Sequence, residues 1–600
     1  MFRPVEMKKI YIVTLSRHFN KVMEGLAKLG VVHLADARET FEKLESVIED
    51  LRDRLREVPL FVNELKTLLD KVDVLMKKLE VEDKYVKLSK FKGLSVEDAL
   101  KVIEERVDAI NSEYGEFVKK AEELSELESR LKELESKFKE VEHLPDTSSV
   151  KVKLREELEL VSAEFQMKMQ LLRNFLESLR EKHADFLLEA KTFIEMYLPL
   201  EESKVLTVHT PLLSFIEGFV PVTEMEKVKS IVEDLTDGEV LVLVSDLDEH
   251  EEAPVVLRTP KFIKPFETLI KTYDVPSYHE INPSLVVAIT FPLIFGLMFA
   301  DVGHGLLLAL FGVAMIYAKK KGLPPSEMIR LIASGAEVYI LCGVAAMFGG
   351  LMFGEMFGFH MYEILGKAFE HPPLGFILES IPGIGKVFSP LEDPMKMFKL
   401  SLIVGAIHIG IGLTLRILNE VLLGEYKEAF FGSVCWLWFY VGFIYLVLFK
   451  FKLNIDLWIG NTIPSPQNPL PIGFIAIVLP IIIMFAGMVK LEGFIDGFAH
   501  VFEAMISSLS HTVSYGRILA LSLSHGILSK LLTDAFHALG LLGYPILAIG
   551  TIFMVMALEG LVSFTHVLRL TWVEFGFKYF HGGGMEFKPL SFGVNLYEGE

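Results

Sequence analysis

The sequence predicts an α-helical membrane protein with eight transmembrane helices, preceded by a cytoplasmic α/β lobe that carries a long inserted coiled-coil arm. Residues 1 to about 280 are rich in Glu, Lys and Asp, whereas residues 284 to 580 are mostly apolar with clustered charges. The chain is 51% hydrophobic and yet has a formal net charge of -20, as expected when two unlike halves are averaged. The first half is therefore expected outside the bilayer and the second half within it.

The lobe is predicted from two segments that each read as strand, helix and strand. The first comprises strand 8–16, helix 17–30 and strand 31–36, and the second comprises strand 212–222, helix 223–235 and strand 239–246. Two such units of this size favour one ferredoxin-like lobe, with a large insertion between its halves. We assign 1–37 and 204–260 to this lobe.

The insertion, 38–203, is predicted to be a helical arm. Its clearest stretch, AEELSELESRLKELESKFKEVEHL, has apolar residues at three- and four-residue steps and Glu and Lys residues four apart. The pattern is interrupted near 91–95 and 144–149. We expect long antiparallel helices that are at least partly coiled coil, with or without a second small lobe at the far end. A plain helical spacer is the alternative.

After a linker at 261–283, the segment 284–600 is predicted to be an ion-translocation domain that crosses the bilayer. Each candidate span has at least about 17 mostly apolar residues, enough to cross a hydrocarbon layer of about 30 Å. The eight spans are 284–300, 304–319, 330–352, 397–417, 430–449, 472–489, 501–533 and 545–578. The last two are long enough to tilt or to extend past the membrane.

Loop charges predict that both termini lie in the cytoplasm and that the protein is a multi-pass cell-membrane protein. Lys319–Lys321 and the charges of LRILNEVLLGEYKEAF fit cytoplasmic loops, although Lys450 and Lys452 fall on the other side. The N-terminus lacks the apolar core and cleavage site of a signal peptide. The acidic net charge and the absence of a basic stripe argue against nucleic-acid binding. No GxxxxGK[ST] or GxGxxG motif occurs, so we expect no nucleotide site in this chain. We also expect no catalytic residue, cofactor or metal.

The most informative feature of the membrane half is Arg517, near the middle of span 501–533. On one helical wheel at about 100° per residue, six polar side chains fall within about 40° of one line. They are Glu503, Ser507, Ser510, Ser514, Arg517 and His525. A guanidinium is costly inside a bilayer and stays protonated, so it indicates a partner charge or a water-filled path. Any one serine alone is better explained by helix packing.

The last span carries a second polar face. Glu559, Ser563 and His566 fall within about 60° of one another, with Arg569 beside them. Carboxylates and imidazoles exchange ions or protons, hydroxyls hold water, and a fixed cation blocks leakage. Arg569 lies near the end of its span, where snorkelling to the interface is the alternative. Together the two faces predict ion translocation.

Two other functions are considered. A secondary ion antiporter also uses intramembrane charges, but it is expected to show inverted repeats and broken spans, and neither is visible in the sequence. A membrane-tethered coiled-coil scaffold explains the arm but leaves the polar stripe unexplained.

Four motifs make the chain resemble the membrane-bound a subunit, or subunit I, of the V-type and A-type rotary ATPases. They are PFETLIKTYDVPSYHEINPS, FGLMFADVGHG, SHTVSYGRILALSLSHGILS and LEGLVSFTHVLRLTWVEFGFKYF, and the resemblance covers essentially the whole chain. The sequence departs from the family at Ser507, where many relatives carry Asn, and at Ala300, where Gly is common.

The resemblance implies a non-catalytic stator subunit. It implies that Arg517 faces the carboxylate of a rotating proteolipid c ring, with Arg569 close by. It also implies that Glu503, Glu559, His525 and His566 line two ion half-channels. The expected partners are the c ring, the peripheral-stalk subunits contacted by the arm, the central-stalk and ring-adaptor subunits, and the lipid bilayer.

Overall fold

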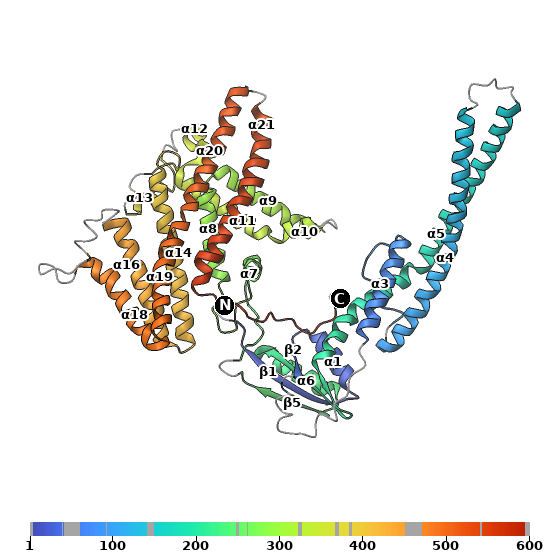
Figure 1. The fold of residues 1–600 in the computed structure, drawn as a ribbon, viewed down its shortest axis with the longest axis horizontal. Coiled ribbons are helices and arrows are strands. Elements are labelled where there is room, and N and C mark those ends of the chain that lie inside the picture. Colours follow the sequence, from blue (N-terminus) through green and yellow to red (C-terminus); the bar gives the residue numbers. More distant parts are fainter. Residues whose placement is uncertain are drawn as a thin grey trace. The chain divides into compact units, whose positions relative to one another are not determined.

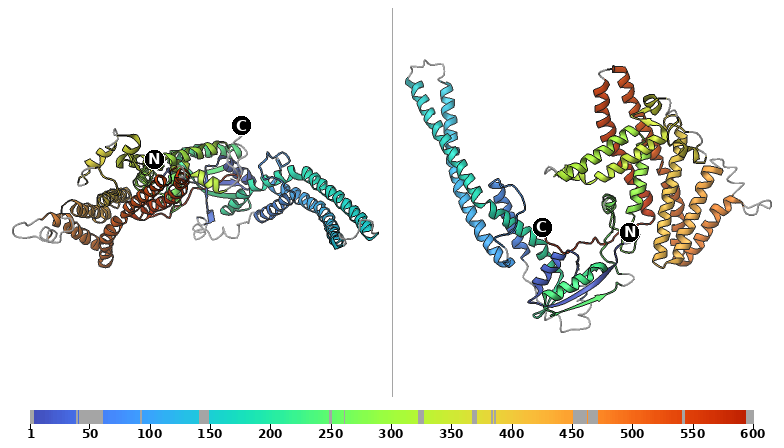
Figure 2. Two further views of the ribbon diagram at one scale, coloured as in Figure 1. Left: turned by 90° about the horizontal axis from the view of Figure 1, so that it is seen from above. Right: turned by 180° about the vertical axis from the view of Figure 1, so that it is seen from behind.

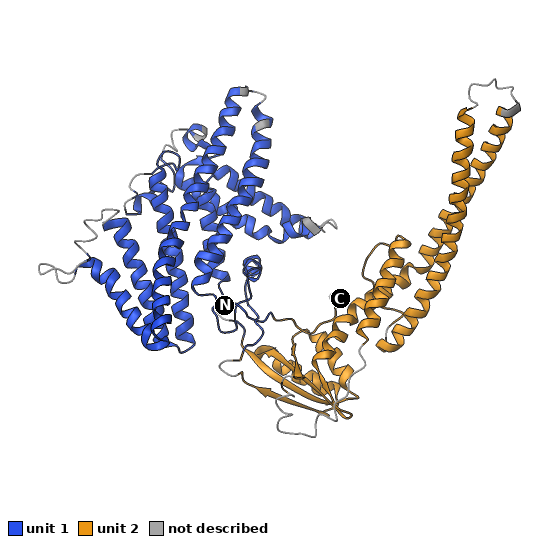
Figure 3. Cartoon of the chain, in the orientation of Figure 1, with its two compact units in different colours: residues 1–5, 252–586 blue, residues 6–251, 587–600 orange. Residues whose placement is uncertain are grey.

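The computed structural model divides the chain into two compact units (Figure 3). One unit comprises Glu6–Glu251 with Phe587–Glu600, and the other comprises Met1–Val5 with Glu252–Glu586. The described residues are 4–38, 40, 61–91, 93–140, 149–247, 251–260, 262–321, 327–366, 371–382, 384, 387–450, 462, 471–540 and 543–593. The unit boundary near 586 differs from the sequence assignment, which placed the whole segment 284–600 in the membrane domain.

Unit 2 of Figure 3, Glu6–Glu251 with Phe587–Glu600, contains the predicted lobe. Its strands and helices are β1 (Met7–Leu15), α1 (Phe19–Leu29), β2 (His33–Ala35), β3 (Val208–His209), β4 (Leu213–Pro221), α6 (Met225–Leu235) and β5 (Val240–Ser245). The strand order is β2-β4-β1-β5, and every neighbouring pair is antiparallel (Figure 1). The short strand β3 pairs with the first residues of β4. This is the split βαβ arrangement that the two strand–helix–strand segments predict.

The lobe buries alternate residues of its central strand, as a sheet with one covered face requires. Ile10 and Ile12 of β1 pack in one hydrophobic cluster with residues of α1 and α6, including Val22, Leu26 and Val228. Helices α1 and α6 pack closely, since a Cβ added at Gly25 would meet the side chain of Leu235. Two βαβ helices therefore share one face of the sheet.

The C-terminal segment returns to this lobe. The backbone N–H of Leu590 donates to Val32 O at 2.7 Å, and the N–H of Lys588 donates to His33 Nδ1 at 2.9 Å. Leu590 and Phe592 are buried in the lobe's hydrophobic cluster. No sequence pattern predicts this contact.

The insertion forms three helices, α3 (Val62–Lys78), α4 (Val96–Glu140) and α5 (Ser149–Ser203). Helices α4 and α5 lie side by side along much of their length in each view (Figures 1 and 2). At the end nearer the lobe, α3 joins them around one hydrophobic cluster. The predicted break near 91–95 precedes α4, whereas the break at 144–149 falls mostly on residues outside the described ranges.

Unit 1 of Figure 3, the membrane unit, is largely helical, and six of its described helices are long and apolar enough to cross a membrane. They are Val302–Lys321, Ala336–Phe353, Pro394–Leu422, Tyr426–Lys450, Phe474–Glu492 and Gly543–Lys578. A seventh apolar helix, α8 (Ser284–Met298), is shorter. The linker predicted at 261–283 contains a short helix, α7 (Lys264–Lys271). The predicted span 501–533 is not one helix: it is divided between α19 (Phe494–Ser514) and α20 (Gly516–Leu539).

Glycines allow very close packing of α8, α9 (Val302–Lys321) and α11 (Ala336–Phe353). A Cβ added at Gly349 would lie 2.4 Å from Gly296 O, and one at Gly343 would lie 2.5 Å from Ala309 N. Backbones this close exclude any side chain at the crossing point, so these glycines pack helices, as small residues do in membrane proteins.

The chain passes between the two units three times, after residues 5, 251 and 586. The passing segments are hydrogen-bonded to one another. The N–H of Val5 donates to Val256 O at 2.9 Å, and the N–H of Val255 donates to Met585 O at 2.8 Å. Val255 and Glu586 also form a parallel bridge.

Candidate ion-translocation site

The helix break at Tyr515 positions the residues around Arg517. Tyr515 is fully buried, and its hydroxyl is hydrogen-bonded to His408 Nδ1 at 2.7 Å. Gly405 makes room for the ring, since a Cβ there would lie 2.4 Å from Tyr515 Cγ. The turn is closed by the N–H of Tyr515 donating to Thr512 O. The single helical wheel used for the polar stripe therefore does not extend across this residue.

Arg517 forms an ion pair with Glu574, a residue that was not predicted from the sequence. Arg517 Nη1 donates to Glu574 Oε1 at 3.0 Å. The Glu574 side chain is 2% exposed and that of Arg517 is 19% exposed. Glu574 lies in a π-helical segment, Leu570–Phe575, within the last membrane helix. A lone carboxylate in the apolar run WVEFGF is the sequence signal that would have identified it.

A second pair links α20 to the last membrane helix. His525 Nδ1 lies 3.0 Å from Glu559 Oε2, and both side chains are almost fully buried. Glu559 ends another π-helical segment, Thr551–Glu559. Segments of this kind are frequently found at functional sites, although this chain also has them in other membrane helices. The structure thus brings together two of the residues that the sequence analysis selected.

Asp301 and His304, at the start of α9, extend this second pair. The rings of His304 and His525 have centroids 5.3 Å apart. Asp301 accepts the backbone N–H groups of His304, Phe357 and Gly358, each at 2.9 Å. Four titratable side chains from three segments of the chain therefore meet in one buried place.

The predicted residues of α19 lie at its surface. Ser507 is half-buried and accepts a hydrogen bond from Lys578 Nζ at 2.9 Å. Lys578 Nζ also lies 4.5 Å from the centre of the Trp436 ring. Glu503 and Ser510 are exposed in this chain.

The opposite face of α19 is held by hydrogen bonds to α16 (Cys435–Tyr445). Trp436 Nε1 donates to Ser508 Oγ, and the hydroxyls of Tyr440 and Thr512 are hydrogen-bonded. This packing places Ser508 and Thr512 against α16, whereas Glu503 and Ser510 are exposed.

The other predicted residues of the last span lie on α22 (Gly560–Arg569). Ser563 is buried on the same side as Glu559, His566 is half-buried, and Arg569 is exposed. Among the described residues, Arg569 forms no ion pair. Arg569 is thus not paired with Glu559 or Glu574 within the described residues.

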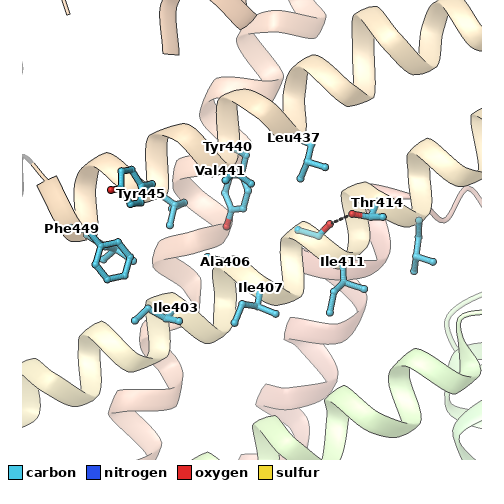
Figure 4. Close-up of a pocket in the computed structure, with 14 residues that line it drawn as sticks. Ile403, Ala406, Ile407, Ile411, Thr414, Leu437, Tyr440, Val441, Tyr445 and Phe449 are labelled. Atoms are coloured by element: carbon cyan, nitrogen blue, oxygen red, sulfur yellow. Dashed lines mark hydrogen bonds between the residues drawn. The ribbon is translucent and has the colours of Figure 1, made fainter. Parts of the chain in front are cut away.

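A cavity of about 620 Å³ lies elsewhere in the membrane unit, between α14 (Pro394–Leu422) and α16 (Figure 4). Its lining is mostly apolar and includes Ile403, Ile407, Ile411 and Val441. The hydroxyl of Thr414, also in the lining, donates a hydrogen bond to Gly410 O of its own helix. The lining residues that the structure describes include no carboxylate, imidazole or cationic side chain, so they do not supply groups that exchange ions.

Comparison with known proteins matches residues 146–373 and 487–592 to the V-type ATPase 116 kDa subunit family. A-type ATP synthase subunit I of Methanocaldococcus jannaschii is 30% identical over 406 residues, which cover 63% of this chain and 54% of that protein. The same subunit of Methanothermobacter thermautotrophicus is 27% identical, covering 78% of this chain and 62% of that protein. V-type proton ATPase subunit a1 of Arabidopsis thaliana is 23% identical, covering 63% and 58%. The chain thus matches over about three fifths of the length of these relatives.

Proposed function

The chain belongs to the V-type ATPase 116 kDa subunit family, and on this premise we propose that it is the membrane stator subunit of a rotary ATPase or ATP synthase. In this role it provides the ion half-channels and the arginine that faces a carboxylate of the rotating proteolipid ring. It is a non-catalytic subunit, because the nucleotide chemistry belongs to other subunits of the complex.

The observation that carries the proposal is the pairing and partial exposure of the Arg517 side chain. Glu574 engages the guanidinium through one oxygen at 3.0 Å, and the arginine side chain remains partly exposed in the isolated chain. A guanidinium has five donor N–H groups in a fixed fork. Arg517 is therefore held in place from one side while donors remain for an acid supplied by another polypeptide.

The mechanism follows from this arrangement. Ring carboxylates arrive neutral from the lipid, release their ion into one half-channel, and pass Arg517 in the ionised form. The guanidinium stabilises that ionised form by direct charge interaction. The carboxylates then reload from the other half-channel. Glu574 limits how tightly a ring carboxylate binds, because it competes for the same cation.

The half-channels are proposed to be lined by the two sets of predicted polar residues. Glu559, Ser563 and His525 lie together in the buried interior, with His566 and Arg569 further along the same helix. Glu503 and Ser507 lie on the outer face of α19. Two separate sets of polar residues support the proposal, because each half-channel needs its own polar lining.

The eight-span topology remains a proposal. It combines the six long apolar helices with α8 and with the α19–α20 pair as one broken crossing. Both termini and the N-terminal unit then lie in the cytoplasm. There the arm, with α4 and α5 as a coiled coil, is proposed to contact the peripheral stalks, and the membrane unit to contact the c ring.

The test is ATP-driven ion transport by the reconstituted complex carrying Arg517→Ala. We expect transport to fall to background while the subunit still assembles with its partners. Arg517→Lys is also expected to lose most transport, because lysine lacks the planar fork and deprotonates when desolvated. Arg330→Ala, on the exposed surface of α10 (Glu327–Ser334), is the matched control and is expected to retain transport. Full transport by Arg517→Ala would overturn the proposal.

A further inference from the structure

We propose that Asp301, His304 and His525 form a binding site for a divalent transition-metal ion such as Zn²⁺. One carboxylate oxygen of Asp301 and one ring nitrogen of each histidine lie within 4.8 Å of one another. All three residues are at least 98% buried. Two imidazoles and one carboxylate make up a known three-ligand zinc set, which leaves a fourth position open.

His525 is oriented as a metal ligand would be. Its Nδ1 lies 3.0 Å from Glu559 Oε2, and its Nε2 has no hydrogen-bond partner among the described residues. A carboxylate on Nδ1 places the ring proton there and leaves a lone pair on Nε2. Metal-bound histidines almost always donate their other N–H to such a partner. Glu559 therefore acts as the outer group of a carboxylate–histidine–metal triad.

His304 supplies a second geometric observation. Its Nδ1 is buried and lies 3.2 Å from Asp301 Oδ1, without the geometry of a hydrogen bond. A cation bound by both atoms would satisfy this nitrogen at that separation, as would a proton on the imidazole. An ion between the two residues would be bound by this nitrogen and would neutralise the Asp301 carboxylate.

Asp301 is held rigidly for this task. Three backbone N–H groups donate to its two oxygens, which fixes the carboxylate against rotation. Two of these donors belong to Phe357 and Gly358, both of which adopt positive φ. Metal ligands in proteins are usually held in position by hydrogen bonds from neighbouring groups in this way.

The ligand types select the class of ion. Imidazole nitrogen suits Zn²⁺, Co²⁺ and Ni²⁺, whereas Mg²⁺ and Ca²⁺ prefer sites made of oxygen atoms. The sequence did not predict the site, because His525 is more than 200 residues from Asp301 and His304. Only the packing of α20 against the start of α9 brings the third ligand into place.

Metal binding is measured first, on the purified full chain in detergent after removal of metal by a chelator. We expect one equivalent of Co²⁺ with the visible absorption of a four- or five-coordinate site, displaced by Zn²⁺ but not by Mg²⁺. His304→Gln is expected to lose this spectrum, and Glu559→Gln to weaken binding about 10–100-fold. His511→Gln, a membrane-unit histidine outside the cluster, is the control and is expected to retain it.

X-ray absorption of Zn²⁺ bound to the unmodified chain makes the result independent of any variant. Two imidazole nitrogens at about 2.0–2.1 Å are expected. Absence of bound metal in the folded wild-type chain, zinc with oxygen ligands only, or a spectrum unchanged in a folded His304→Gln variant would overturn the site.

The consequence for transport rests on the proposed function. A metal on Nε2 would hold His525 and its partner Glu559 in place and would arrest ion exchange there. Zn²⁺ is expected to inhibit ATP-driven transport. Half-inhibition of the His304→Gln variant is expected at a Zn²⁺ concentration about tenfold or more above that for the unmodified chain. Each transport rate is taken relative to the rate of the same protein without metal. Metal binding without inhibition would support the site and contradict an ion path through Glu559.

Discussion

Arg517 and Glu574 approach each other from two helices, with 3.0 Å between Nη1 and Oε1. The carboxylate is almost completely buried, and its second oxygen has no hydrogen-bond partner among the described residues. The arginine therefore has a resident partner within its own chain. Any acid from a partner subunit must compete with that partner.

Glu574→Gln tests this relationship. The amide keeps the shape of the side chain but removes its charge, so Arg517 is left with a weaker acceptor in a buried place. We expect the membrane unit to lose about 1–3 kcal/mol of stability. The measurement is the temperature at which half of the heated protein still elutes as one monodisperse peak, and it should be lower in the variant. Glu425→Gln, at an exposed position, is the control. Equal midpoints for the two variants would show that the pair contributes no stability.

Gly349→Ala tests the close approach of α11 to α8. The added Cβ would lie 2.4 Å from Gly296 O, so the helices must separate, at a cost of about 1–3 kcal/mol. Gly410→Ala is the matched control, because nothing lies within 4 Å of a Cβ at that membrane-helix glycine. Thermal stability in detergent is the measurement. A Gly349→Ala variant as stable as Gly410→Ala would contradict the packing described for α8 and α11.

Glu189→Ala tests how α5 holds the segment before α4. Glu189 accepts hydrogen bonds from Ser89 Oγ at 2.7 Å and from the backbone N–H of Lys90 at 2.9 Å. Removing a carboxylate that binds such donors is expected to cost about 1–3 kcal/mol. The readout is faster hydrogen exchange of the amides at 86–91. Glu181→Ala, exposed on the same helix, should leave those rates unchanged.

The lobe is expected to lose stability in mild acid because of His209. This side chain is buried and hydrogen-bonded to Thr207 Oγ1 and Ser214 Oγ. Burial lowers its pKa from 6.5 to about 4. The unfolded chain therefore binds more protons than the folded chain between these two values, and stability falls as the pH falls through that window.

We expect this loss to be roughly 1–2 kcal/mol after allowance for solvent screening. The measurement is hydrogen exchange of β4 at pH 7 and pH 5, corrected for the intrinsic rates. His209→Gln cannot titrate and should show a smaller difference between the two pH values. An identical difference in both proteins would assign the acid effect to other groups.

The lobe could be predicted because its signals are local. Apolar and polar residues alternate along β1, and a glycine at position 30 ends the first helix, where it adopts positive φ. Both signals lie within short windows of sequence. The contact of Leu590 with Val32 could not be predicted, because it joins residues from opposite ends of the chain. Local patterns contain no information about such pairs.

The candidate site could be predicted in part for the same reason. Arg517, His525 and Glu559 stand out as charged or titratable groups in apolar segments. The turn at Tyr515 was missed because no proline or other local break signal marks it, and the partner of its side chain, His408, lies more than 100 residues away. Glu574 was missed because a helical wheel on one segment does not show which neighbouring helix faces it. The pairings therefore required the structure.

The three hydrogen-bonded segments near Val5, Val255 and Met585 have a mechanical consequence. All three segments belong to the same compact unit, and residues 255–256 bond to both of the others, to Val5 through Val256 O and to Met585 through the N–H of Val255. This short middle segment therefore fastens the first residues and the last residues of that unit to each other. Its loss would free both at once.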